Sequence, residues 1–139
     1  MQIMLIQFVP HQIQYKIMFG LILYIQMSNP TISIDTSKAE VMQAAIQAGA
    51  NFINDVNALQ NKGCVEIVAK ADLPVCLMHK KGSPKSMQKN PEYSDVLSEV
   101  MDFFKQRINT CLAMGIKKQN IILDPGIGFG KTLKHNLTL

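Results

Sequence analysis

The sequence contains no tryptophan and only three cysteines among its 139 residues. The cysteine count is odd and no C-x-x-C pair occurs, which argues against a disulfide framework and against a structural zinc site. Cys64, Cys76 and Cys111 are therefore interpreted as free thiols. Cys76 and Cys111 lie in apolar patterns that are typical of small core residues. This use of cysteine favours a reducing, cytoplasmic setting.

Charged residues are also few, at 17% of the chain, and the formal net charge is +4. No run of lysine or arginine with interleaved aromatic residues occurs, so the sequence predicts no nucleic-acid partner. The longest uninterrupted apolar stretch, residues 17–25, is far shorter than the roughly 20 residues that a membrane span requires. We therefore expect no membrane partner. A modest positive charge suits small anionic substrates.

The first thirty residues differ from the rest because Lys16 is their only charged residue. They lack a basic start and a small-residue cleavage site, so they do not resemble a signal peptide. We divide the chain into a leading segment, residues 1–30, with no assigned role, and a domain, residues 31–139.

From Thr31 onwards, two kinds of segment alternate. Short apolar or β-branched runs predict four strands, at residues 31–35, 51–56, 74–78 and 121–124. Segments of helical periodicity separate them, at about residues 37–48, 63–70 and 90–114, and a last helix is expected to begin near Leu133. The strands are almost wholly apolar, as are strands covered on both faces. This order predicts an α/β fold with about four parallel strands and crossover helices.

Two of the helix starts carry specific signals. Ser37 and Glu40 have the spacing of a capping box, which predicts a helix start at Ser37. Asn90 and Pro91 form a cap and first-turn pair, which predicts a second start. The residues of that later helix that recur at helical spacing are predicted to be buried: Leu97, Met101, Phe104, Ile108 and Cys111 or Leu112.

Polar side chains occur where each predicted strand ends. Asp35 ends the first strand, Asn54 and Asp55 lie in the second, His79 follows the third, and Asp124 ends the fourth. The carboxyl ends of parallel strands meet at one edge, which is the ligand edge of barrels and open sheets. One such Asp often only caps the next helix, but four strand ends together indicate a ligand site. Carboxylates and amides suit a ring with amide-like donors and acceptors, such as a pterin.

Residues 124–131, DPGIGFGK, form the most specific motif of the chain. The glycines let the backbone approach a ligand closely, while Phe129 offers an aromatic face and Lys131 a positive charge. A Walker phosphate loop is excluded because its first glycine would fall at position 125, which is proline. The dinucleotide pattern G-x-G-x-x-G is absent too.

Four motifs, in this order and at this spacing, resemble the dihydropteroate synthase family, and the resemblance covers residues 31–139. They are Asp35-Thr36-Ser37-Lys38, Ile53-Asn54-Asp55-Val56, Leu77-Met78-His79 with Gly82 and Pro84, and residues 124–131. One departure is Lys80-Lys81, where many relatives have an uncharged residue beside the histidine.

The resemblance implies a TIM (β/α)8 barrel, of which this chain would supply part. It implies that 6-hydroxymethyl-7,8-dihydropterin pyrophosphate condenses with p-aminobenzoate to give 7,8-dihydropteroate, with Mg2+ assisting release of pyrophosphate. It also implies sulfonamide inhibition and, in the complete enzyme, a possible homodimer.

By the same resemblance, six side chains are expected to bind substrate: Asp35, Asn54, Met78, Asp124, Phe129 and Lys131. The two carboxylates and the amide would contact the pterin ring, Met78 would pack against it, and Phe129 would line the p-aminobenzoate pocket. Neither a catalytic residue nor a metal ligand is assigned within this chain.

A TIM barrel needs about 250 residues. The family's loops for pyrophosphate, Mg2+ and p-aminobenzoate are expected before Thr31, and its Ser-Arg-Lys and Arg-x-His segments after Leu139. The chain alone is therefore expected to be inactive. Two alternatives stay open: an inactive remnant, and a methyltetrahydrofolate methyltransferase-type pterin-binding domain, which the GxGFGK stretch disfavours. Whether Asp55 and His79 contact ligand or only support the fold also stays open.

Overall fold

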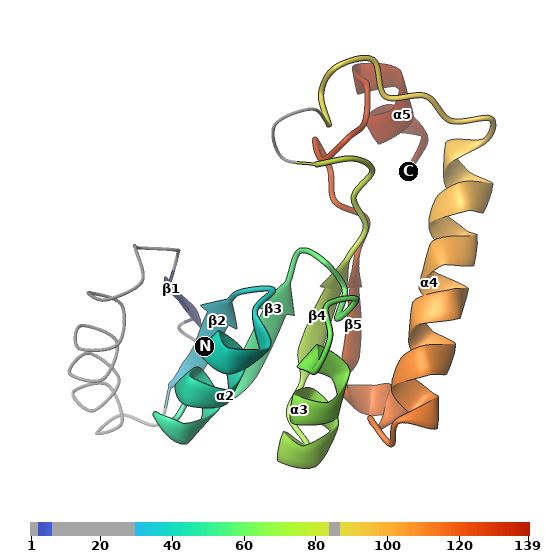
Figure 1. Ribbon diagram of the computed structural model, residues 1–139. Helices are drawn as coiled ribbons and strands as arrows, with labels where there is room; N and C mark the ends of the chain where they lie inside the picture. The colour runs from blue at the N-terminus through green and yellow to red at the C-terminus, as the bar shows by residue number, and fades with distance from the viewer. Residues whose placement is uncertain (1–2, 7–29, 84–86) are drawn as a thin grey trace.

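The computed structural model describes residues 3–6, 30–83 and 87–139, so most of the leading segment and Pro84 of the third motif lie outside the described residues. Five strands form one parallel sheet in chain order, β1-β2-β3-β4-β5 (Figure 1). The strands are β1 (Ile3–Ile6), β2 (Thr31–Asp35), β3 (Phe52–Asp55), β4 (Val75–Met78) and β5 (Ile121–Asp124). The prediction of parallel strands with crossover helices is confirmed.

Strand β1 was not predicted. It pairs in parallel with β2, from Ile3 opposite Thr31 to Ile6 opposite Ile34. A run of four apolar residues without flanking turn signals cannot be told from a helical segment by its pattern. The described sheet therefore has one strand more than the four expected, and that strand comes from the leading segment.

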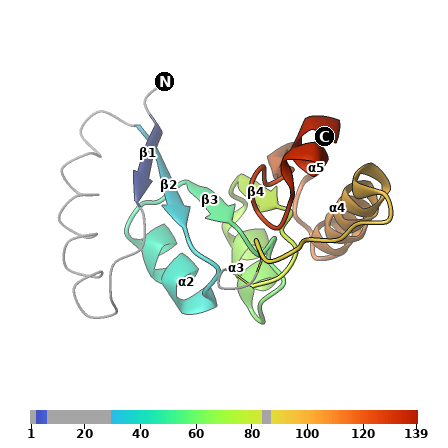
Figure 2. The same cartoon turned by 90° about the horizontal axis from the view of Figure 1, so that it is seen from above.

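The helices are α2 (Ala39–Gln47), α3 (Cys64–Ala71), α4 (Val96–Ala113) and α5 (Leu133–Thr138), with a 3-10 turn η2 (Lys118–Asn120). Helices α2 and α3 lie side by side on one side of the row of strands, and α4 runs antiparallel to β4 and β5 (Figures 1 and 2). The loops after β4 and β5 gather with α5 at the carboxyl end of the strands (Figure 1). None of the helices in the described ranges is long and apolar enough to span a membrane.

Both predicted helix starts are wrong. Helix α2 begins after Lys38, which makes no side-chain capping hydrogen bond, and the carbonyl of Ser37 instead accepts a hydrogen bond from Asn61 Nδ2 at 2.6 Å. Helix α4 begins after Asp95, whose carboxylate accepts from the backbone N–H groups of the first turn. Asn90 has a left-handed φ of 54°, whereas an N-cap residue has extended backbone.

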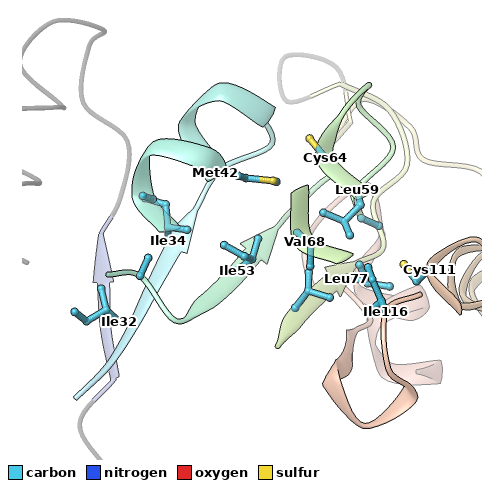
Figure 3. Packing of buried hydrophobic residues seen from close by; sticks show 14 of the residues in the cluster. Ile32, Ile34, Met42, Ile53, Leu59, Cys64, Val68, Leu77, Cys111 and Ile116 are labelled. Carbon is cyan, nitrogen blue, oxygen red and sulfur yellow. The ribbon is translucent and has the colours of Figure 1, made fainter. Parts of the chain in front are cut away.

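The hydrophobic core lies between the sheet and its helices (Figure 3). Alternate strand residues, including Ile34, Ile53 and Leu77, point into it and are at most 4% exposed. Full burial of one such side chain contributes about 1.5–3 kcal/mol. The helices supply Met42, Val68 and Cys111. The alternation of the strands thus turns one set of side chains to this core and the other set to the opposite face of the sheet.

The buried face of α4 is shifted from the prediction at its start. Leu97 and Met101 are each 49% exposed, and the side chains one position earlier, Val96 and Val100, are buried. Both sets repeat every four residues, so spacing alone does not separate them. The prediction was right for Phe104 and Cys111, which are buried.

Candidate functional site

The strand register aligns polar side chains on the face of the sheet that turns away from the core. Asp35 is paired with Asn54, Asn54 with Cys76, and Met78 with Asp124. Paired residues of neighbouring strands point to the same face, as do residues two apart within a strand. Four of the six predicted site residues, two carboxylates, one amide and one thioether, therefore share one face near the carboxyl end.

The Asp35 carboxyl group is half-buried on this face. Burial raises its pKa above the ordinary value, and a hydrogen bond with Asn54 lowers it in part. A carboxylate in such a partly desolvated place binds a ligand N–H more strongly than one in bulk water. Asn54 supplies both a donor and an acceptor beside it.

Cys76 belongs to this face, which sequence reasoning missed by treating it as a core residue. It is half-buried, whereas its neighbours in the strand, Val75 and Leu77, are 0% exposed in the core. Burial raises the pKa of the Cys76 thiol to about 11, and the negative charges of Asp124 and Asp35 contribute. Successive side chains of β4 point to opposite faces of the sheet. This alternation could have placed Cys76 on the face that Leu77 does not occupy.

We predict that Cys76 resists alkylation at pH 8. A thiol with a pKa of about 11 has roughly 100-fold less thiolate at pH 8 than an ordinary cysteine. Iodoacetamide should therefore modify Cys76 at least 100-fold more slowly in the folded chain than in urea, and the rate should rise about tenfold per pH unit up to pH 10. Peptide mass spectrometry separates Cys76 from the buried Cys64 and Cys111. A rate equal to that of the unfolded chain would contradict the placement.

The loop after β5 is built on Asp124. Its Oδ1 accepts a hydrogen bond from the backbone N–H of Gly126 at 2.7 Å, and within the described residues no bond is made to Oδ2, which can accept from a ligand. The N–H of Phe129 donates to the Gly126 carbonyl at 3.0 Å, which closes the turn. The Phe129 ring is 37% exposed, so part of an aromatic face is available beside the site.

Lys131 lies beneath this loop and is only 3% exposed. Its Nζ lies 3.0 Å from His79 Nδ1 and 3.0 Å from the Gly126 carbonyl oxygen. It also donates to the carbonyl oxygens of Phe129 at 3.2 Å and His79 at 3.3 Å. Burial lowers the pKa of Lys131 to about 8, against the opposing effect of Asp124. Lys131 is therefore an internal hydrogen-bond donor in this structure.

The sequence left open whether Asp55 and His79 contact ligand or support the fold, and in the structure both make contacts that support the fold. Asp55 is 0% exposed, and its two oxygens accept from the backbone N–H groups of Asn57 at 2.7 Å and Leu59 at 2.9 Å. The His79 ring packs edge-on against Phe103, with 4.9 Å between ring centroids. Burial, and then the charge of Lys131, lowers the pKa of His79 to about 4, so the ring is neutral at pH 7.

An open cavity of about 1050 Å³ lies between the loop after β4 and the start of α4. Its lining includes Lys81, Tyr93 and Glu99, and none of the six predicted site residues. Lys81 Nζ forms an ion pair with Glu99 at 2.8 Å and lies 4.2 Å above the Tyr93 ring. Lys81, the second residue of the Lys80-Lys81 pair, therefore has a structural partner away from the sheet face that carries Asp35, Asn54, Met78 and Asp124, which we call the ligand face.

Within residues 3–6, 30–83 and 87–139, no group of three or more His, Cys, Asp or Glu side chains could hold a metal ion.

Comparison with known proteins matches residues 15–139 to the family model "Pterin binding enzyme". The chain is 49% identical over 108 residues to dihydropteroate synthase of Haemophilus influenzae, which covers 78% of this chain and 39% of that protein. The solved Yersinia pestis dihydropteroate synthase in a sulfonamide drug complex superposes with a TM-score of 0.86 at 43% identity. The superposition covers 94% of this chain and 48% of the solved chain.

A second solved relative is Xanthomonas albilineans dihydropteroate synthase with 4-aminobenzoic acid, with a TM-score of 0.81 and 38% identity. The match covers 96% of this chain and 47% of that structure. These relatives are TIM-barrel enzymes, so the five-stranded parallel sheet is part of such a barrel. The chain spans about two fifths of the length of the curated relatives that it matches.

Proposed function

We propose, because this chain belongs to the family of pterin binding enzymes, that it forms the pterin-binding part of a dihydropteroate synthase. The reaction condenses 6-hydroxymethyl-7,8-dihydropterin pyrophosphate with p-aminobenzoate and yields 7,8-dihydropteroate and pyrophosphate. The observation that carries the proposal is the alignment of Asp35, Asn54 and Asp124 on one face by the strand register.

In this proposal, the three polar side chains bind and orient the pterin ring. The Asp124 carboxylate accepts from the 2-amino and ring N–H groups through the oxygen that Gly126 does not occupy. Asp35 and Asn54 read the opposite edge of the ring, and Met78 packs on its face. Charge-assisted hydrogen bonds in a partly desolvated site give both affinity and orientation.

The chemistry follows from this orientation. The p-aminobenzoate amine attacks the methylene carbon, a C–N bond forms, the C–O bond to pyrophosphate breaks, and the amine loses a proton. The residues of this chain bind and orient, and we assign none of them a proton transfer. Phe129, which is partly exposed in the loop after Asp124, would line the p-aminobenzoate side, where sulfonamides would compete. The solved relatives with 4-aminobenzoic acid and with a sulfonamide drug support p-aminobenzoate as the second substrate and sulfonamides as its competitors.

Three further features belong to the same proposal. Mg2+ would assist pyrophosphate release in the complete enzyme, but the described residues offer no fitting ligand set, and no step is assigned to it here. The free thiols of Cys64, Cys76 and Cys111 suit a cytoplasmic setting. A homodimer is proposed for the complete enzyme by resemblance alone.

The proposal predicts that Asp124→Ala weakens binding of 6-hydroxymethylpterin to this chain by about 10- to 150-fold, which corresponds to about 1.5–3 kcal/mol for hydrogen bonds to a charged group. Isothermal titration calorimetry at pH 7 is the measurement. Asp124→Asn keeps an acceptor for the Gly126 N–H but offers the ligand an NH₂ group, so it should lose affinity as well.

The matched control for this measurement is Asp102→Ala, because Asp102 is an exposed carboxylate that pairs with Lys105 on the surface of α4. It should leave the affinity unchanged. Equal affinity of the Asp124 variants and the wild type would overturn the assignment of the site, and absence of pterin binding by the wild type would overturn the proposed function of this chain.

A further inference from the structure

The Lys131 side chain has more acceptors around it than an ammonium group has protons. Its three protons face four acceptors: the Gly126, Phe129 and His79 carbonyl oxygens and His79 Nδ1, all within 3.0–3.3 Å. These acceptors come from two segments, the loop after β5 and the end of β4. The ammonium therefore connects two strands at the point where the ligand face ends.

We propose that Lys131 is a positioning residue, whose ammonium fixes the loop of residues 126–130 against the end of β4 and thereby sets the places of Asp124 and Phe129. The ligand part of this inference rests on the proposed function. The same residue was expected from sequence to touch substrate. At 3% exposure, it acts through its neighbours.

The connection to the ligand face runs through two hydrogen bonds. Lys131 Nζ donates to the Gly126 carbonyl at 3.0 Å, and the N–H of Gly126 donates to Asp124 Oδ1 at 2.7 Å. The first bond fixes the backbone at Gly126. The second orients the Asp124 carboxylate so that Oδ2 remains available to a ligand. Lys131 also holds the carbonyl of Phe129, which limits where the aromatic ring can lie.

The contact with His79 defines which ring nitrogen carries a proton. Lys131 can only donate, so His79 Nδ1 must accept, and the proton of the neutral ring is on Nε2. The edge-on contact with Phe103 and the tilted contact with Tyr93 hold the ring in this orientation. The loop is also held from outside, because Tyr93 Oη donates to the Gly130 carbonyl at 2.8 Å.

The charged groups near Lys131 do not replace it as a donor. The charge of Asp124 raises the pKa of Lys131. The neutral ring of His79 faces the Lys131 ammonium directly. Further out, around His79, lie three more titratable groups: Lys81, Glu99 and Tyr93. At pH 7, below a pKa of about 8, most molecules carry the full ammonium with three donors.

The test compares Lys131→Met with Lys134→Met, its matched control, in the whole chain. Both variants remove one charge and keep an unbranched stem, but Lys134 is exposed on α5. Amide hydrogen exchange should show at least tenfold faster exchange at Phe129 and Gly126 in Lys131→Met, and no change in strands β2 and β3. Lys134→Met should match the wild type. Unchanged exchange at the loop amides in Lys131→Met would overturn the proposal.

Ligand binding gives the second readout. Calorimetry with 6-hydroxymethylpterin and, separately, p-aminobenzoate at pH 7 should show at least tenfold weaker pterin binding for Lys131→Met and none of this loss for Lys134→Met. Full pterin affinity with a loosened loop would overturn the positioning role. If the wild type binds neither probe, the proposed function fails, and the exchange comparison alone decides whether Lys131 fixes the loop.

A titration needs no variant, in case Lys131→Met does not fold. The ¹³Cε resonance of Lys131 should titrate near pH 8, and the ring resonances of Phe129 should shift with the same midpoint. Phe129 resonances that do not respond while Lys131 titrates would overturn the proposal, because the loop would then be independent of the ammonium group.

Discussion

Gly126→Ala is expected to destabilise the fold by about 3–5 kcal/mol, which places it among the rare, large single-residue effects. The φ angle of Gly126 is +66°, and a Cβ built on it would lie 2.0 Å from the carbonyl oxygen of His79 and 3.1 Å from its carbon. The left-handed conformation alone costs a residue with a Cβ about 1–2 kcal/mol. The contact with backbone cannot be relieved by a rotamer change, so the loop would have to leave β4.

Gly128→Ala is the matched control for this substitution. Gly128 has a similar φ of +82°, but its Cβ would meet nothing within 4 Å, so only the conformational cost of about 1–2 kcal/mol is expected. Urea denaturation followed by circular dichroism gives both free energies of unfolding. The difference between the two losses in free energy of unfolding measures the steric cost of the close approach between the loop after β5 and the end of β4. Equal losses would mean that the loops are not packed as described.

Asp55→Ala is expected to cost about 3 kcal/mol of stability. The carboxylate is fully buried, and the substitution would leave the N–H groups of Asn57 and Leu59 without their acceptor. Each buried, unsatisfied donor costs about 1–3 kcal/mol. Burial raises the pKa of Asp55, so part of the loss is offset by removal of a desolvated charge. The turn that Asp55 holds is also clamped by Arg107, which donates to the carbonyls of Ala58 and Leu59.

The control for Asp55 is Asp95→Ala. Asp95 also accepts from two backbone N–H groups, those of Leu97 and Ser98 at 3.0 and 3.1 Å, but it is exposed, so water can replace it. The expected loss is smaller than that of Asp55→Ala, because Asp95 is an exposed helix cap. Thermal and urea unfolding of both variants would test this. A smaller loss for Asp55→Ala than for Asp95→Ala would show that burial does not decide the cost.

The order of strands and helices could be predicted from sequence because it depends on local periodicity. The four strands from Thr31 onwards are where alternation and apolar runs placed them. The start of α2 could not be predicted, since the apparent capping residue, Ser37, has its carbonyl held by Asn61 from another segment. Tertiary contacts of this kind compete with a local cap and leave no trace in the spacing.

The same division applies to the candidate site. Asp35, Asn54 and Asp124 could be predicted to lie together because each follows a parallel strand, and such ends meet at one edge. The burial of Lys131 could not be predicted, because it depends on the glycine turns that fold residues 126–130 over its side chain. Charged side chains are usually exposed to solvent, and the buried Lys131 is an exception that lies next to the candidate site.

The pair Asn54 and Asp55 has a consequence for how folding and ligand recognition depend on each other. The two neighbours face opposite sides of the sheet, one toward the ligand face and one toward a buried turn. A slip of β3 by a single residue would exchange them: an amide would enter the core, and a third carboxylate would join Asp35 and Asp124. Ligand chemistry is thus encoded in strand alignment. Any molecule that binds only the correct alignment adds its binding free energy to the stability of that alignment, so substrate would also select the register of the sheet.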